Sequence, residues 1–120
     1  IYIKENSKKN FIILDAAMND LMRPALYGAK HKIIPLRKTN IKINKSYDFV
    51  GPICETTDKF LTTSKFQKLN ENEYVIICDV GAYGKVLRSN YNLRINASEI
   101  LIKKSKVFRI DKKEGLRKFI

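Results

Sequence analysis

The sequence predicts a mainly β domain, an antiparallel barrel or sandwich of about six strands with short helical turns. Short β-branched and apolar runs alternate with turn residues along the chain, and stretches with the apolar period of a helix are rare. At 120 residues the chain is long enough for one sizeable core. We therefore expect residues 1–120 to form a single domain.

The first half of the chain is expected to contain three strands and one helical turn. The run NFIILDA, residues 10–16, is a predicted strand. In residues 17–28, Asn19 or Asp20 is a candidate cap for a short helical turn that Pro24 breaks or restarts and a glycine ends. Two further strands are predicted within residues 29–37 and 43–54.

The second half has one clear strand and one clear hairpin. Residues 56–73 are predicted to be irregular and to end in a turn at 70–73, and Tyr74 to Cys78 form the most strongly predicted strand. Residues 98–114 are expected to form a hairpin around positions 104 and 105. The tail is a candidate short helix with Leu116, Phe119 and Ile120 on one side.

The net charge of +12 has two possible explanations. A basic excess is typical of nucleic-acid binding. Here, however, the lysines are spread over the whole chain, without a dense block or a glycine-aromatic RNA-binding pattern. Isoleucine, lysine and asparagine, which share A/T-rich codons, are all abundant. We therefore attribute the charge to codon usage and do not expect nucleic acid as a partner.

The ends and the cysteines indicate the cellular compartment. The chain begins at Ile1, without the basic start and long apolar run of a signal peptide, and no stretch is long enough to span a bilayer. We expect a soluble, cytoplasmic protein, and the start at Ile1 suggests a piece of a longer one. Cys54 and Cys78 lack metal-type spacing and are expected to be reduced thiols. His31 has no evident acidic partner and is expected to be structural.

Three stretches combine turn residues with polar side chains that can converge on a ligand. In MRPALYG, Arg23 offers a planar fork for a carboxylate and Tyr27 lies one helical turn away. In GPICE, Cys54 is either a core thiol or a proton donor, and Glu55 is either a surface carboxylate or a cation ligand. In GAYG, two glycines form a tight loop around Tyr83. Spacing alone favours the structural alternative for the first two stretches and leaves the third undecided.

Taken in order, the stretches LDAAMNDLMRPALYGA, YDFVGPICETTD and DVGAYGKVLRSNYN closely resemble the carboxyl-terminal β-domain of the diaminopimelate decarboxylase family, which are fold-type III enzymes dependent on pyridoxal phosphate. The resemblance covers most of the chain and implies the β-domain fold of alanine racemase-like decarboxylases. Thr57 stands where family members often have glycine. The family's amino-terminal α/β barrel, with its Schiff-base lysine and phosphate site, is absent from these 120 residues.

The resemblance assigns a role to each candidate residue. It implies that Arg23 and Tyr27 bind the substrate, with the arginine on the distal carboxylate. It implies that Cys54 reaches the active site of the partner subunit and donates the proton after CO2 leaves, and that Glu55 binds the distal ammonium group. Tyr83 is implied to lie against substrate and cofactor. The arginine and glutamate would complement the zwitterionic end of the substrate.

The resemblance therefore implies half of a shared active site in a homodimer that converts meso-2,6-diaminopimelate to L-lysine and CO2. Pyridoxal 5′-phosphate would be held mainly by the barrel, and residues 1–120 alone would be inactive. Two alternatives stay open at this point. The first alternative is the same domain of a decarboxylase that acts on another diamino acid. The second is a free-standing basic β-domain that binds nucleic acid. Ornithine and arginine decarboxylases carry a Cys-Asp pair instead of Cys54-Glu55, which favours diaminopimelate.

Overall fold

Strands dominate the computed structural model, which describes residues 1–111. One sheet has the strand order β1-β2-β4-β5, formed by Tyr2–Glu5, Asn10–Ile13, Tyr47–Val50 and Lys59–Thr63. Two smaller sheets pair β3 (Ile33–Pro35) with β6 (Val75–Ile77) and β7 (Ile100–Lys103) with β8 (Lys106–Arg109). The helices are α1 (Arg23–Tyr27) and α2 (Gly81–Leu87), followed by the short 3-10 turn η1 (Tyr91–Leu93).

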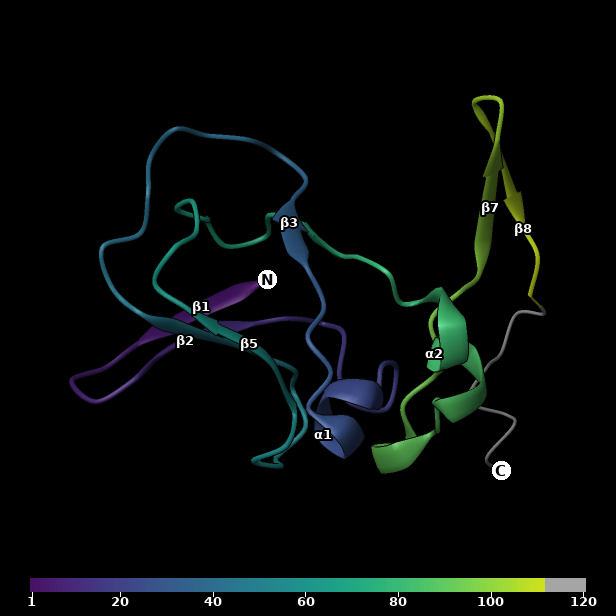
Figure 1. Ribbon diagram of the computed structural model, residues 1–120, viewed down its shortest axis with the longest axis horizontal. Coiled ribbons are helices and arrows are strands. Elements are labelled where there is room, and N and C mark those ends of the chain that lie inside the picture. Colours follow the sequence, from purple (N-terminus) through teal and green to yellow (C-terminus); the bar gives the residue numbers. More distant parts are fainter. Residues whose placement is uncertain (112–120) are drawn as a thin grey trace.

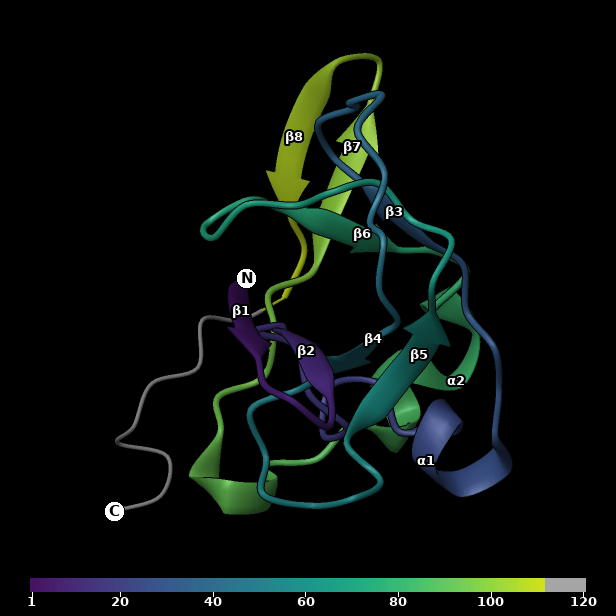
Figure 2. The ribbon, with the colours of Figure 1, turned by 90° about the vertical axis from the view of Figure 1, so that its left-hand side faces the viewer.

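The four-stranded sheet and the β7–β8 hairpin lie at opposite sides of the molecule (Figure 1). Helices α1 and α2 lie next to each other in both views (Figures 1 and 2). The β7–β8 hairpin projects beyond the other strands, and all of its strand residues are exposed (Figure 2). No helix within residues 1–111 is long and apolar enough to cross a membrane.

The core forms where the two central strands of the large sheet meet. Ile12 of β2 is paired with Phe49 of β4, and their exposed fractions are 1% and 0%. The Phe66 ring packs edge-on against Phe49, with 5.0 Å between the ring centroids. These apolar contacts remove the large side chains from water and hold the sheet against Phe66 and the other residues of the core. The remaining buried members of the cluster are Leu14, Leu21, Ile33, Tyr47, Phe60 and Leu69.

The mainly β class predicted from the sequence is confirmed, but two details of the architecture differ. The described sheets are not closed, so a barrel is not confirmed. In addition, β2 and β4 are parallel and not antiparallel. A parallel neighbour needs a long crossover connection, and residues 14–46, which contain α1 and β3, supply it. The sequence pattern of each strand gives no sign of this long-range pairing.

Several local predictions are confirmed and others are wrong. Strands lie where expected at residues 10–13 and 75–77, and the hairpin turns at Lys104 and Ser105. The expectation of an irregular stretch over 56–73 is wrong, since β5 lies within it and buries Phe60. Strand β1 is not predicted from the sequence. The predicted tail helix, with Leu116, Phe119 and Ile120, lies outside the described residues.

Helix α1 starts at Arg23 and Pro24. Of the two predicted alternatives, a break or a restart at the proline, the structure shows the restart. Pro24 lies in its first turn and Gly28 ends it with a φ of 63°. In this left-handed region glycine has no steric penalty. Asn19 and Asp20 are not its caps, because the preceding residue is Met22 and no side chain caps the helix. Asp20 instead caps the turn before it, accepting a hydrogen bond of 2.9 Å from the Ala17 amide.

Gly51 follows β4 at a place where the backbone approaches a buried carboxylate. A Cβ added at this position would lie 2.3 Å from Oδ2 of Asp58. We expect Gly51→Ala to lower the free energy of unfolding by about 1–3 kcal/mol, because the clash forces a buried group to move. Gly81→Ala is the matched control, since nothing lies within 4 Å of its added Cβ. Chemical denaturation of both variants tests this, and equal stabilities would contradict it.

Candidate functional site

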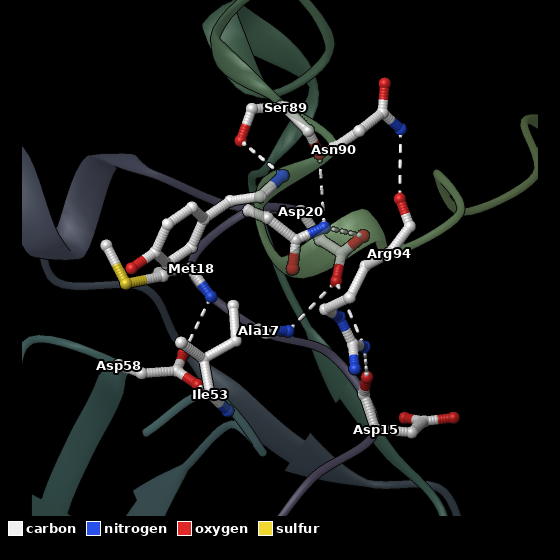
Figure 3. Close-up of polar contacts among 11 residues, drawn as sticks. Asp15, Ala17, Met18, Asp20, Ile53, Asp58, Ser89, Asn90 and Arg94 are labelled. Atoms are coloured by element: carbon white, nitrogen blue, oxygen red, sulfur yellow. Dashed lines mark hydrogen bonds and ion pairs between the residues drawn. The ribbon is translucent and has the colours of Figure 1, made fainter. Parts of the chain in front are cut away.

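The loop after β4 takes its shape from the Asp58 carboxylate (Figure 3). This side chain is 2% exposed. Its Oδ2 accepts a hydrogen bond of 2.8 Å from the Ile53 amide, and its Oδ1 accepts one of 2.7 Å from the Met18 amide. Burial raises the pKa of Asp58, although the two amide donors partly oppose that shift. The carboxylate therefore joins the loop of residues 51–58 to the loop of residues 15–20.

A second set of polar contacts joins the 15–20 loop to residues 89–94 (Figure 3). The buried side chain of Asn19 donates to the Ser89 carbonyl at 3.3 Å, and the Ser89 amide donates to the Asn19 carbonyl at 2.9 Å. Arg94 donates to the Asp15 carbonyl and has its guanidinium 3.9 Å from a carboxylate oxygen of Asp20. Three segments far apart in the sequence thus meet at one place.

Two of the predicted site residues lie face to face where α1 meets α2. The Arg23 guanidinium carbon is 5.8 Å from the centroid of the Tyr83 ring, within the range of a cation–π contact. Ala82 and Tyr83 have the dihedral angles of a type II turn, and Tyr83 takes the left-handed position with a φ of 65°. The tight loop predicted around Tyr83 is therefore present, and its tyrosine occupies a position that usually favours glycine.

Cys54 and Glu55 lie on the exposed part of the 51–58 loop. Both residues are exposed, and Cys54 is a free thiol. The Glu55 carboxylate accepts a hydrogen bond of 2.6 Å from the hydroxyl of Tyr91, which belongs to η1. A hollow of about 430 Å³ borders the loop and is lined in part by Cys54, Glu55 and Thr56. The loop thus presents a thiol and a carboxylate beside an open space.

Tyr27 and Cys54 lie apart from the contact between Arg23 and Tyr83. Tyr27 lies one turn after Arg23 in α1 and is 67% exposed. Within residues 1–111, no hydrogen bond or ion pair joins Tyr27 or Cys54 to the pair of Arg23 and Tyr83. The structural alternative for Cys54, a buried core thiol, is wrong. Thr57 occupies its position without a positive φ and donates to the sulfur of Met18 at 3.7 Å.

His31 is buried, as expected of a structural histidine. Its Nδ1 lies 3.0 Å from the Cys78 carbonyl, while its Nε2 has no hydrogen-bond partner within the described part of the chain. Cys78 is a second free thiol and is partly buried. Among residues 1–111, no group of three or more His, Cys, Asp or Glu side chains is arranged to hold a metal ion.

Sequence reasoning missed the residues that hold this site together. Asp58 and Tyr91 both stand within the motifs quoted above, which assign no role to either residue. The sequence indicates Asn19 only as a helix cap. The signal for Asp58 is a carboxylate at the end of a short turn-forming stretch, which is compatible with a loop anchor. No local pattern in the sequence signals the partners of Asn19 and Tyr91, since they lie 70 and 36 residues away.

Comparison with known proteins relates this arrangement to one family. The sequence model described as "Pyridoxal-dependent decarboxylase, C-terminal sheet domain" matches residues 1–81. A protein from Haemophilus influenzae named diaminopimelate decarboxylase is 40% identical over 116 residues, which are 97% of this chain and 28% of the relative. The chain therefore spans less than a third of the length of this relative.

Two solved structures with the same fold carry the same name. Diaminopimelate decarboxylase from M. jannaschii has a TM-score of 0.88 at 36% identity, covering 96% of this chain and 26% of its own. The Helicobacter pylori enzyme, solved in complex with L-lysine, has a TM-score of 0.86 at 38% identity, covering 98% of this chain and 28% of its own. Each solved chain extends well beyond the part to which this domain corresponds.

We expect Asp58→Asn to lower the free energy of unfolding by about 1–3 kcal/mol. An asparagine offers one acceptor oxygen in place of two, so either the Met18 or the Ile53 amide loses its acceptor while buried. Asp15→Asn is the matched control, because the exposed Asp15 contributes only its backbone carbonyl to the cluster. Urea denaturation measures both variants. Equal losses of stability in the two variants would show that the Asp58 carboxylate does not stabilise the loop.

The hydrogen bond to Glu55 raises the pKa of Tyr91, because it stabilises the neutral phenol beside a negative charge. The stability that this bond contributes is present below pH 10, the ordinary pKa of tyrosine, and is lost as the pH rises through the higher pKa of the folded state. We expect Glu55→Gln to lower the Tyr91 pKa. A pH titration of ¹³Cζ-labelled tyrosines by NMR measures it, and an unchanged Tyr91 pKa would contradict the assigned bond.

Proposed function

The chain belongs to the pyridoxal-dependent decarboxylases as their C-terminal sheet domain, and on this premise we propose that it forms part of an enzyme that converts meso-2,6-diaminopimelate to L-lysine and CO2. One observation carries the proposal. Arg23 and Glu55, side chains of opposite charge, are each in contact with a tyrosine of residues 81–93, and an exposed thiol stands next to the glutamate. The names of the relatives support the same substrate.

The two charges suit a substrate whose distal end is itself a zwitterion. The Arg23 guanidinium can bind a carboxylate through two parallel hydrogen bonds, and contact with the Tyr83 ring limits the orientations that it adopts. The Glu55 carboxylate has two oxygens, and only Oε1 accepts the Tyr91 hydroxyl. Its other oxygen can accept a hydrogen bond from an ammonium group. A diamino acid without a distal carboxylate would lose the contribution of Arg23.

Tyr83 can make an additional contact with the cofactor. Tyr83 is 65% exposed, and its hydroxyl has no hydrogen-bond partner among residues 1–111. The ring and hydroxyl are therefore free to contact a planar, polar group. When bound, pyridoxal phosphate supplies the electron sink that accepts the electron pair of the broken carbon–carboxylate bond. The lysine and the phosphate site that hold it are assigned to the part of the enzyme beyond this chain.

Cys54 is the residue we assign to the return of the proton. Its thiol is exposed on a loop that the Asp58 carboxylate fixes at Ile53, the residue before it. The S–H bond breaks as a C–H bond forms at the carbon that has lost CO2, and the thiolate then takes a proton from water. We propose that this delivery takes place in the active site of the partner subunit of a homodimer. The domain alone would then be inactive.

The roles of Arg23 and Cys54 can be tested in the full-length parent enzyme. We expect Cys54→Ala to lower kcat for diaminopimelate by about 100-fold or more, since a positioned general acid contributes that much. Arg23→Lys keeps the charge but loses the paired hydrogen bonds, so its kcat/KM should fall about tenfold or more. Steady-state assays of lysine formation measure both.

The matched control for Cys54→Ala is Cys78→Ala, because Cys78 is also a free thiol and lies outside the loop. Thermal denaturation of each holoenzyme separates loss of activity from loss of folding. If the Cys54 and Arg23 variants turn over diaminopimelate at the rate of the unmodified enzyme, the assigned roles are wrong. If the unmodified parent forms no lysine, the proposed substrate is wrong.

A further inference from the structure

Resting on the function proposed above, we propose that Tyr91 is a specificity-determining residue that positions Glu55. Its hydroxyl holds one oxygen of the Glu55 carboxylate, so that the other oxygen points to the distal ammonium group of the substrate. Tyr91 itself need not touch the substrate. Its effect would therefore appear in the choice between substrates with and without that ammonium group.

The geometry of the contact carries this inference. The Tyr91 hydroxyl donates to Oε1 of Glu55 across 2.6 Å, a short and charge-assisted hydrogen bond. Both side chains are exposed, so the bond is not a by-product of core packing. A free glutamate side chain samples many rotamers, and fixing one of them in advance removes that entropic cost from binding. Tyrosine suits this task because it has few rotatable bonds.

The backbone on the Glu55 side of the contact is fixed. The Glu55 amide donates to the Ile53 carbonyl at 2.8 Å, and the Glu55 carbonyl accepts from the Asp58 amide at 3.1 Å. The Asp58 carboxylate in turn holds the Ile53 amide. Tyr91 therefore acts on a side chain whose main chain has little freedom left. The freedom that remains is in the orientation of the Glu55 carboxylate, and Tyr91 restricts it.

The segment that carries Tyr91 is held in place by polar contacts and not by apolar burial. Tyr91 is 45% exposed and Leu93 is 67% exposed. The main chain of Ser89 is bonded twice to Asn19, with distances of 2.9 and 3.3 Å. The Asn90 side chain donates to the Arg94 carbonyl at 2.9 Å and closes the turn around Tyr91 (Figure 3). Hydrogen bonds thus hold this turn in place although its side chains are largely exposed.

The same segment has an unfavourable backbone conformation directly after Tyr91. Asn92 and Leu93 have φ values of 57° and 55°, both in the left-handed region. Asparagine tolerates this region, but a leucine rarely adopts it. Such conformations persist where the surroundings impose them, and they gather at functional sites. Here they lie directly after the residue whose hydroxyl binds the Glu55 carboxylate.

The test uses Tyr91→Phe in the full-length parent holoenzyme. The two substrates are meso-diaminopimelate and 2-aminopimelate, which has the same chain and distal carboxylate but lacks the distal amine. We expect the ratio of kcat/KM between them to fall about tenfold, because a hydrogen bond to a charged group is lost. The value for 2-aminopimelate should change little. Tyr74→Phe is the matched control, since Tyr74 is 71% exposed and has no hydroxyl contact among residues 1–111.

A double variant separates positioning from a merely structural role. Glu55→Gln should itself lose most of the discrimination, and adding Tyr91→Phe to it should produce no further loss, because Tyr91 acts through Glu55. Equal losses on both substrates, or additive losses in the double variant, would overturn the inference. So would an unchanged ratio in Tyr91→Phe. Failure of the unmodified parent to decarboxylate diaminopimelate would instead overturn the proposed function on which the inference rests.

Discussion

The buried carboxylate of Asp58 is the constraint on which the rest of the site depends. It accepts backbone amides from Met18 and Ile53, which belong to loops distant in sequence. A carboxylate at 2% exposure is unfavourable unless its oxygens have donors, so the two loops and the side chain stabilise one another. The loop that presents the exposed Cys54 and Glu55 therefore owes its shape to a buried side chain.

The segment of residues 81–93 contacts the two charged side chains of the proposed site. Tyr83 contacts Arg23, and Tyr91 contacts Glu55. Each tyrosine lies in or beside a left-handed backbone conformation, so local strain accompanies both contacts. One segment of the chain therefore contacts both of the charged side chains that the proposed function assigns to substrate binding.

The sequence predicted those features that local patterns determine. Strand β2 follows from a continuous apolar run, and the β7–β8 hairpin follows from two apolar runs around a turn. The motif order indicates Arg23, Cys54, Glu55 and Tyr83, whose roles stay predictions. The parallel pairing of β2 with β4 and the bond between Tyr91 and Glu55 join residues far apart in the chain. No local pattern contains such pairings, and β5 was missed because threonines dilute its apolar run.

The proposed site is open to water in the form described here. Tyr27 and Tyr83 are 67% and 65% exposed, and Cys54 is also exposed. In water the attraction between a substrate carboxylate and Arg23 is weak, whereas the same contact in a site that excludes water is several times stronger. Decarboxylation also needs groups fixed around the reacting carbon before the bond breaks. This domain fixes its half of those groups through Asp58, Tyr83 and the η1 turn. Under the proposed function, a second surface that covers the same loops excludes the water, and the chemistry belongs to the assembled enzyme.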